Sequence, residues 1–565
     1  MWSPEPEKSK SMLSNPIIQR ELVGMLRSRR ALVIQVLLVA TFGLLVILRW
    51  PSDPRVDLNG ARSMQVFRLF GYGLLAAILL LVPAFPASSI VREKQQGTLA
   101  LLLNTPMTAG QIYLGKLLGV MGFVMLVLVL SLPSAVACYA MGGISFQQGL
   151  LPLYVLLILV ALQYSSLGLL ISSHATSTDS AMKLTYGAIL VLAVVTLGPY
   201  LFLQGVTGEE AAGWVRSISP LPAVMEILGQ RDLGGQGLEV TAGAHWKYAL
   251  LAVISTVGMS FLTLRRLNVR IFDETRAQGV MTHELKGTEW LLRNVIYMAG
   301  VTDPQRRRGE ISRLFNPVMV KEFRCRRFGR LHWILRLVCG CAILSFLLTF
   351  IGLNFTHGWG VERIGGILVI LQVSLVVLLT PSITAGLISG ERESGSWQLL
   401  QMTPMSGWKI VRGKLMSVVY TLLLLVMATL PAYVIMIYLK PEMQKQVIEV
   451  LYCLLAAMVF SVSVSAAISS LARTTAVATT ASFCVLVTLF AGTLLFWLGE
   501  GAPFGHDLVE VVLRLNPLAA ALAAMQMPGF TSYDLVPHNW YIMGVASLGG
   551  FLVLALQTIR LTRPQ

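Results

Sequence analysis

LLGVMGFVMLVLVLSLPSAVACYAMGGISFQQGLLPLYVLLILVALQYSSLGLLISSHATST, residues 117–178, contains no Asp, Glu, Lys or Arg. A helix that crosses a bilayer needs about 20 apolar residues, so this stretch is long enough for two such helices. The glycines between residues 142 and 149 mark a turn between them. Strands of a membrane β-barrel alternate polar and apolar residues, and this stretch does not. It therefore predicts a helical protein with several membrane spans.

The composition of the whole chain leads to the same prediction. Hydrophobic residues make up 55 % of the 565 residues and charged residues only 13 %, whereas about a quarter of the residues of a soluble domain are charged. The mean hydropathy is +0.70. These values exclude an ordinary soluble enzyme, a disordered chain and a fibrous repeat. The six cysteines show no metal-ligand spacing and are expected to be small core residues.

Charge-free runs locate the other spans. In the first half they cover residues 31–48, 69–91, 117–178, 184–208 and 248–264, and in the second half 337–361, 364–390, 415–439, 450–472, 474–499 and 535–559. Because residues 117–178 hold two spans, each half has six. The predicted fold class is an all-α polytopic membrane protein with twelve transmembrane helices as two parallel six-span repeats. Residues 515–533 are also uncharged, but Pro517, Pro528 and Gly529 favour a re-entrant or surface helix over a thirteenth span.

The distribution of Lys and Arg predicts the orientation of these spans. With the N-terminus in the cytoplasm, the cytoplasmic segments hold 33 of the 44 Lys and Arg residues. Basic residues gather in cytoplasmic loops of membrane proteins, which also accounts for the net charge of +16 without a nucleic-acid partner. The polar N-terminus has no signal peptide, so the first apolar run is expected to remain as a span. We expect an integral protein of a prokaryotic cytoplasmic (inner) membrane, with both termini cytoplasmic.

The two halves of the chain resemble each other in order. Residues 93–117 and 391–415 align without a gap, and 11 of the 25 positions are identical. Ile-Ser-Ser occurs at 171–173 and again at 468–470. Two repeats with an even number of spans enter the membrane from the same side. We therefore predict one six-span repeat in residues 1–265, a second in residues 315–565, and a charged cytoplasmic linker at residues 266–314. Its three consecutive arginines bind either a partner or RNA or, as we favour, face anionic lipid.

The repeated loop carries the most specific pattern. It reads EKQQGTLALLLNTP from residue 93 and ERESGSWQLLQMTP from residue 391. The charged residues and the glycine end the preceding span, Thr98 or Ser396 caps a short helix, and a Thr-Pro pair ends that helix. Paired leucines supply an apolar contact face. The pattern predicts a short cytoplasmic helix held between two spans. The alternative, an ordinary interfacial turn, does not explain why the same polar letters occur twice.

Patterns typical of enzymes are absent or incomplete. The sequence has neither H-E-x-x-H nor G-x-S-x-G. Residues 110–116 fit the start of a P-loop, but Leu117 stands where Ser or Thr must bind magnesium, and no strand precedes it. We therefore expect no ATP hydrolysis by this chain. The polar residues within the spans either bridge helices, which we favour, or line a path. They are Gln35, Gln163, Ser165, Ser166, Gln372 and Ser374.

The repeated loop resembles the loop after the second span of type-2 ABC transporter permeases, the six-span membrane subunits of ATP-binding-cassette exporters. In that family the short helix docks on the ATPase subunit. The resemblance assigns this coupling role to Glu93, Gly97, Thr98, Leu101, Leu102, Thr105 and Pro106, and to Glu391, Gly395, Ser396, Leu399, Leu400, Thr403 and Pro404. Segments before the first span of each half resemble the family's elbow helix. Their matching residues are Asn15, Pro16, Arg20 and Glu21, and Asn316, Pro317, Lys321 and Glu322.

The resemblance implies two permease halves fused in one chain, which form the translocation path of an exporter. The implied partners are the lipid bilayer, an unknown transported substrate and two copies of a soluble P-loop ATPase. These copies are the same or different, since Trp397 replaces Leu99 and Gln401 replaces Leu103. ATP and magnesium are expected on the ATPase, with no catalytic residue, cofactor or metal in this chain. An ion-coupled secondary transporter with six plus six spans is the alternative. A second alternative is a membrane-embedded enzyme or scaffold. Both alternatives would need ionisable residues at the centres of the spans.

Overall fold

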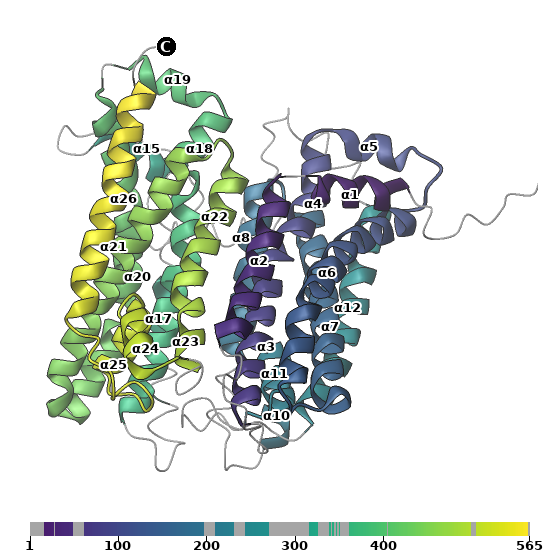
Figure 1. Ribbon diagram of the computed structural model, residues 1–565. Coiled ribbons are helices and arrows are strands. Elements are labelled where there is room, and N and C mark those ends of the chain that lie inside the picture. The colour runs from purple at the N-terminus through teal and green to yellow at the C-terminus, as the bar shows by residue number, and fades with distance from the viewer. Residues whose placement is uncertain are drawn as a thin grey trace, which may run out of the picture.

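The computed structural model describes residues 16–27, 29–48, 61–196, 209–230, 243–269, 316–325, 361–403, 405–498 and 504–562, with a few single positions between 338 and 350. Every regular element within these residues is a helix. The helices form two bundles that stand side by side, one built from the first half of the chain and one from the second (Figure 1).

Both bundles contain long helices joined by short ones. The first consists of α1 (Pro16–Leu26), α2 (Arg29–Leu48), α3 (Ala61–Leu81), α4 (Ala84–Gln95), α5 (Thr98–Leu103), α6 (Ala109–Ala140), η2 (Phe146–Leu150), α7 (Leu151–His174), α8 (Thr178–Val195), α10 (Glu209–Arg216), α11 (Pro220–Ile227) and α12 (Ala244–Val269). The second consists of α15 (Pro317–Cys325), α17 (Val361–Thr384), α18 (Gly386–Glu393), α19 (Ser396–Gln401), α20 (Gly407–Leu439), η6 (Pro441–Met443), α21 (Gln444–Leu471), α22 (Thr475–Val487), η7 (Thr488–Gly492), α23 (Leu494–Leu498), α24 (His506–Leu513), α25 (Pro517–Ala524) and α26 (His538–Thr562).

Nine helical segments in the described part of the chain are long and apolar enough to cross a membrane. They cover Ser63–Gln95, Ala109–Ala140, Phe146–His174, Ala244–Leu267, Gly365–Glu393, Gly407–Leu439, Pro441–Leu471, Thr475–Trp497 and His538–Arg560. Helix α2 coincides with a further predicted span, and α8 covers the first part of another, residues 184–208, of which 197–208 lie outside the described residues. The predicted span at residues 337–361 lies largely outside the described residues. The all-helical membrane class is confirmed, whereas the count of twelve spans remains a prediction.

Short helices close the end of each bundle opposite α5 and α19 (Figure 1). Helix α25 has eight residues and is about 12 Å long, too short to cross a bilayer of about 30 Å. This agrees with the preference for a short helix over a thirteenth span. Helices α25 and α11 begin alike, because Asn516 Oδ1 accepts a hydrogen bond from Leu518 N–H and Ser219 Oγ accepts one from Leu221 N–H.

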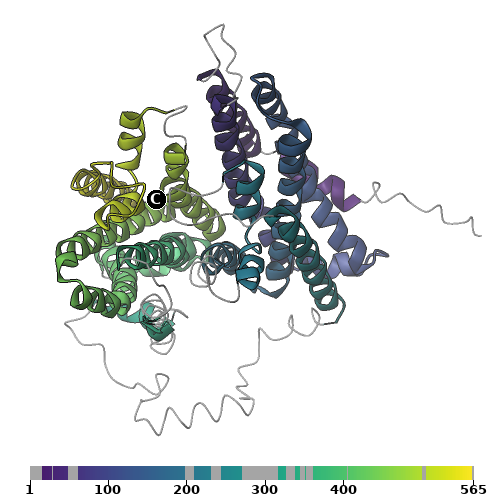
Figure 2. The same ribbon diagram turned by 90° about the horizontal axis from the view of Figure 1, so that it is seen from below.

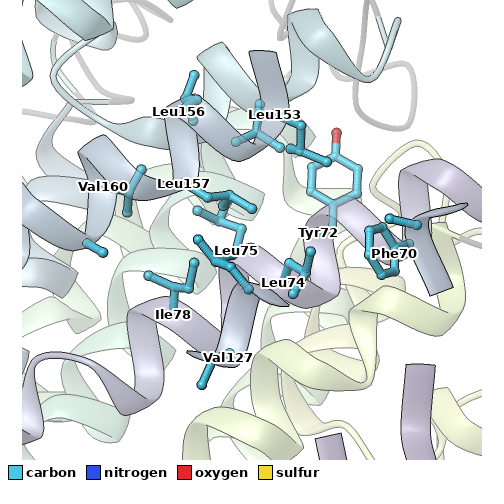
Figure 3. Close-up of a cluster of buried hydrophobic side chains, with 14 of the residues drawn as sticks. Phe70, Tyr72, Leu74, Leu75, Ile78, Val127, Leu153, Leu156, Leu157 and Val160 are labelled. Carbon is cyan, nitrogen blue, oxygen red and sulfur yellow. The ribbon is translucent and has the colours of Figure 1, made fainter. Parts of the chain in front are cut away.

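Each bundle has its own apolar core. In the first bundle, side chains from α3 and α7 interdigitate, with Phe70, Leu74 and Leu157 fully buried (Figure 3). A separate cluster fills the second bundle. Cys138 lies in the first cluster and Cys453 in the second, so both are small core residues, as expected. Cys339 is exposed, so the expectation is wrong for that residue.

Buried polar side chains join neighbouring helices within each bundle. Gln163 of α7 accepts a hydrogen bond from the Tyr248 hydroxyl of α12 at 2.8 Å, and its amide nitrogen donates to Ser255 of α12 at 2.9 Å. In the second bundle, Gln372 of α17 accepts from the Tyr433 hydroxyl of α20 at 2.7 Å. These two glutamines therefore bridge helices, the favoured interpretation of the polar residues within the spans.

The two bundles lie side by side (Figure 2), and α8 of the first packs against α22 and α17 of the second. The rings of Tyr186 and Phe483 stack across this contact with their centroids 5.3 Å apart. Close by, the Thr479 hydroxyl of α22 donates a hydrogen bond to Asp179 Oδ1 of α8 at 2.6 Å. The Thr480 hydroxyl donates to the Met182 sulfur at 3.7 Å, so the contact between the halves combines an aromatic pair with two polar contacts.

Candidate functional site

The two repeated loops lie at one end of the molecule, where α5 and α19 project from the bundles (Figure 1). Each short helix follows a glycine with a positive φ, +71° at Gly97 and +72° at Gly395. This left-handed conformation strains any residue with a Cβ, so the glycine allows the sharp turn out of the preceding helix. The repeated glycine therefore sets the direction of each short helix.

The predicted side-chain caps are wrong in detail. The N-cap position of α19 is Gly395, which has no side chain, and Ser396 is the first helical residue. Thr98 is likewise the first residue of α5. The Thr98 hydroxyl donates instead to the Glu93 carbonyl oxygen at 3.3 Å, and the Ser396 hydroxyl donates to the Glu391 carboxylate. Both hydroxyls therefore fasten the short helix to the helix before it.

The Thr-Pro pair ends the short helix as predicted in the first loop. The Thr105 hydroxyl donates to the Leu102 carbonyl oxygen at 2.6 Å, and the Thr403 hydroxyl donates to the Leu400 carbonyl oxygen at the same distance. Both bonds satisfy a carbonyl that the end of a helix leaves free. Pro106 follows as an exposed residue, whereas Pro404 lies outside the described residues.

The structure divides the paired leucines into an exposed and an inward-facing one. Leu101 is 69 % exposed and Leu399 is 68 % exposed. Leu102 is buried against Ile17 and Ile112, and Leu400 packs against another buried cluster, which includes Val318 and Ile410. The prediction that both leucines of each pair form a contact face is therefore corrected. One leucine per loop faces outward and its neighbour anchors the helix.

A second apolar residue completes each anchor. Leu99 is buried in a cluster with Tyr113 of α6 and Leu169 of α7. In the second loop Trp397 occupies the same position, where it is buried among residues that include Ile388 and Ile410. The larger ring thus replaces the leucine without changing its role, and both short helices are held by an inward residue three positions before the inward leucine.

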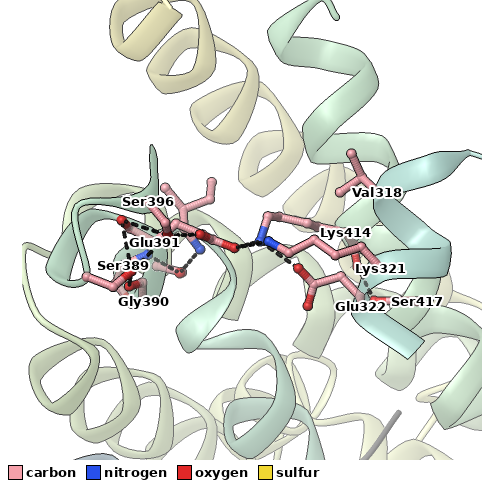
Figure 4. A network of polar contacts seen from close by, with 12 residues as sticks. Val318, Lys321, Glu322, Ser389, Gly390, Glu391, Ser396, Lys414 and Ser417 are labelled. Atoms are coloured by element: carbon pink, nitrogen blue, oxygen red, sulfur yellow. Dashed lines mark hydrogen bonds and ion pairs between the residues drawn. The ribbon is translucent and has the colours of Figure 1, made fainter. Parts of the chain in front are cut away.

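A network of charges lies behind the second loop (Figure 4). The Lys414 ammonium is 2.8 Å from Glu322 Oε1 and 2.8 Å from Glu391 Oε1, and only 1 % of its side chain is exposed. Lys321 Nζ is 3.1 Å from Glu391 Oε1. Two positive and two negative groups therefore neutralise one another, and water has little access to Lys414 and Glu322 among them. The network joins the elbow helix α15, the end of α18 and the start of α20.

The first half contains the matching network. The Lys116 ammonium is 3.2 Å from Glu21 Oε1, 3.0 Å from Glu93 Oε2 and 2.9 Å from the Ser89 hydroxyl, and its side chain is 1 % exposed. Arg20 binds Glu93 in the position that Lys321 takes in the second half. This network joins the elbow helix α1 to the end of α4 and to the start of α6.

These networks show what the two loop glutamates contact. The carboxylates of Glu93 and Glu391 are ion-paired with Lys116 and Lys414 of this chain. The P-loop-like residues 110–116 lie within α6, and their lysine is the buried Lys116. The lysines are the functional residues that the sequence interpretation missed. The signal was the Gly-Lys pair repeated at the same distance from each glutamate.

The elbow residues have structural roles in both halves. Pro16 is the first residue of α1, a position that suits proline, and Asn15 lies outside the described residues. In the second half Asn316 Oδ1 accepts from Val318 N–H at 3.0 Å, and its amide donates to the Lys409 carbonyl at 2.8 Å. Asn316 therefore caps the elbow helix, which begins at Pro317, and ties it to α20.

Charge pairing keeps the elbow glutamate ionised. Burial alone would raise the pKa of Glu21, but the ammonium of Lys116 and the guanidinium of Arg20 outweigh burial, so this pKa lies below its usual value. The carboxylate is therefore charged at neutral pH, where it pairs with the buried side chain of Lys116.

The middle serine of each Ile-Ser-Ser motif fixes the helix that leads into the loop. Ser172 Oγ accepts hydrogen bonds from the N–H groups of Ile90 and Val91, at 3.1 and 3.0 Å. Ser469 Oγ accepts from Ile388 and Ser389 at 3.1 and 3.2 Å. The repeated motif thus has a repeated function, which is to hold α7 against α4 and α21 against α18.

Replacing Ser469 by Ala is expected to destabilise the protein by about 1–3 kcal/mol, because two buried N–H groups lose a shared acceptor. The matched control is Ser470→Ala, since the Ser470 hydroxyl bonds only the Ala467 carbonyl of its own helix. Thermal unfolding in detergent provides the measurement. An equal change in melting temperature for both variants would contradict the assigned role of Ser469.

Together, the fold and the site define a polytopic helical membrane protein whose two halves each present a short helix, fixed by an ion-paired elbow, at the same end. The chain belongs to the ABC-2 family of transporter proteins, whose sequence model matches residues 15–273 and again residues 297–555. This confirms the resemblance noted in the sequence. The protein is therefore a membrane permease of the ABC type, and the two matches agree with an internal repeat.

Two similar proteins from Escherichia coli support this assignment. The chain is 26 % identical over 186 residues to the probable multidrug ABC transporter permease YbhR of strain K12, and equally to that of strain O157:H7. The alignment covers 32 % of this chain and 47 % of each relative. The chain thus matches about half the length of these relatives.

Proposed function

We propose that this permease forms the translocation path of an ABC exporter and is driven by two separate ATPase subunits, one bound to α5 and one to α19. The observation that carries the proposal is the pair of exposed leucines, Leu101 and Leu399, on short helices fixed behind by buried ion networks. A mobile loop would absorb a push from a partner. A short helix anchored by apolar packing and by ion pairs passes that movement to the spans.

The ion networks can transmit a movement of the ATPase subunits to the membrane spans. Each network joins the elbow helix to the end of one span and the start of the next, and Thr98 or Ser396 ties the short helix to the glutamate of the network, so these elements move together. We infer that closure of the ATPase pair shifts both elbows and both networks, and that this opens the contact between α8 and α22 on alternate sides. The Tyr186–Phe483 stack lies within that contact. A path between these helices favours an apolar or amphipathic substrate.

The proposal includes the arrangement predicted from the sequence. It has twelve spans in two parallel repeats, residues 1–265 and 315–565, joined by a cytoplasmic linker at 266–314. The loops and both termini face the cytoplasm, and the membrane is the cytoplasmic membrane of a prokaryote. ATP and magnesium bind the ATPase subunits, which are the same or different. The two docking surfaces that this chain offers to the ATPase subunits differ, since the exposed Met402 of the second loop replaces the exposed Asn104 of the first.

Affinity purification of the tagged chain from native membranes tests the proposal. A soluble ATPase with a P-loop is expected to co-purify, and it is expected to be lost when both exposed leucines are replaced by Asp. An ion-coupled secondary transporter would instead purify without an ATPase. It would transport in vesicles in response to an ion gradient, and that result would overturn the proposal.

The isolated chain is expected neither to bind nor to hydrolyse ATP. Residues 110–116 are helical, and the ammonium of Lys116 is occupied by Glu21 and Glu93, so no phosphate cradle is formed there. The measurement is equilibrium binding of a radiolabelled nucleotide to the purified chain, with the ATPase complex as the positive control. Stoichiometric binding to the chain alone would contradict this expectation.

A further inference from the structure

A groove follows the seam between α21 and α26 in the second bundle. It consists of two adjoining hollows of about 470 and 480 Å³, which share Tyr452 and Trp540. The first hollow is lined by charged residues that include Glu442, Lys445 and Glu449. The second is lined almost entirely by apolar residues and ends at Phe551. The groove therefore has a polar end and an apolar end.

The two shared aromatic residues mark the boundary between these ends. Their ring centroids are 5.6 Å apart, and the Trp540 indole N–H donates to Cys453 Sγ at 3.2 Å, which fixes the ring. Trp and Tyr gather where the hydrocarbon region of a membrane meets its headgroups. The charged hollow thus lies at headgroup level and the apolar hollow within the hydrocarbon.

The apolar hollow has the depth of one leaflet. From Trp540 to Phe551 the helix advances by about 16 Å, roughly half of the 30 Å hydrocarbon thickness. Gly544 keeps this hollow open, because a Cβ at that position would meet no atom within 4 Å. In the first bundle, four residues after the matching Trp246, the exposed side chain of Leu250 stands in place of that glycine.

The charged hollow suits a headgroup that carries both signs. Lys445 is 88 % exposed and lies 4.0 Å from Glu449, so its ammonium is available to a phosphate, and Glu442 adds a second carboxylate nearby. The two carboxylates accept hydrogen bonds from a primary ammonium, whereas the methylated ammonium of a choline headgroup has no N–H to donate. The positions that match Lys445 and Glu449 in the first bundle are Gln148 and Pro152, which are uncharged.

We propose that this groove binds one glycerophospholipid with a primary-amine headgroup, its phosphate at Lys445, its ammonium at Glu449 and Glu442, and one acyl chain along Gly544. At the matching positions of the first half, Gln148, Pro152 and Leu250 replace the charged pair and the glycine. The site therefore makes the two halves of the permease unequal in their contact with lipid. This inference rests on the membrane fold and stands whether or not the chain docks an ATPase.

Native mass spectrometry of the full chain in detergent tests the proposal, with phosphatidylethanolamine or phosphatidylcholine added at equal concentration. We expect one phosphatidylethanolamine per chain, retained several-fold more than phosphatidylcholine. Gly544→Phe fills the hollow and is expected to reduce the retained lipid at least several-fold. Gly549→Phe is the matched control, since it adds the same ring to the same helix in open space outside the groove. Glu449→Gln is expected to remove the preference between headgroups while lipid binding persists.

Two results would overturn the proposal. Retention of phosphatidylethanolamine by Gly544→Phe at the level of the wild type would place the lipid elsewhere. Equal retention of both lipids by the wild type would show that the charged hollow does not select the headgroup.

Discussion

Replacing Leu101 by Asp is expected to weaken docking of the ATPase on the first half by ten- to hundredfold. Burying one leucine in an interface contributes about 1.5–3 kcal/mol, and each 1.4 kcal/mol corresponds to a factor of ten. Leu399→Asp is expected to have the same effect on the second half. Because Leu101 and Leu399 are exposed in the chain alone, neither change should disturb its folding. Co-purification of the ATPase measures docking, and vesicle transport measures its consequence.

The matched control is Gln96→Asp, which adds the same charge to an exposed residue of the same loop before α5 begins. It should leave docking unchanged. Leu102→Asp serves a different purpose, since this buried side chain packs on Ile17 and Ile112. It is expected to lower the melting temperature, whereas Leu101→Asp is not. Full docking and transport by both exposed-leucine variants would mean that the loops are plain interfacial turns.

Replacing Lys414 by Met is expected to destabilise the protein by about 3–5 kcal/mol, the largest effect on stability that we predict. The substitution keeps the length and apolar stem of the side chain but removes the charge between Glu322 and Glu391. Glu322, which is 4 % exposed, then lies beside a thioether in place of its ammonium partner. Removing one partner of a buried ion pair is costly because the remaining charge stays out of water. Thermal unfolding in detergent measures the change.

Lys409→Met is the control for this substitution. Lys409 lies near the start of the same helix, α20, but it is exposed, and substitution of such a surface residue changes stability by about 0.5 kcal/mol or less. A marked fall in melting temperature is therefore expected for the Lys414 variant and almost none for the control. Equal melting temperatures for the two variants would show that the buried network does not hold the elbow to the loop.

The sequence predicts the spans and the place of the loops because these depend on local patterns. A charge-free run of about 20 residues has few alternatives in a chain of this composition. The short helices α5 and α19 could be predicted because polar and glycine residues occur twice at the same spacing. Gly97 and Gly395 do adopt the left-handed conformation that such a turn requires.

The details of the site depend on contacts between distant parts of the chain. Nothing local distinguishes Leu101 from Leu102, since Leu102 is covered by Ile17, which lies 85 positions earlier. Lys116 follows a glycine at the start of an apolar run, where a lysine is usually an interfacial charge. It is buried because Glu21 and Glu93 come from two other helices to neutralise it. Such ion pairs can be predicted only once the position of the elbow helix against α6 is known.

The number of ATPase subunits bound by one chain tests the central claim most directly. The mass of the complex purified from native membranes is to be measured for the wild type, for each single variant, Leu101→Asp and Leu399→Asp, and for the double variant. If each short helix forms one ATPase-binding site, the wild type binds two ATPase subunits, each single variant binds one, and the double variant binds none. An unchanged count of two in the double variant would contradict the assignment of α5 and α19 as the docking helices.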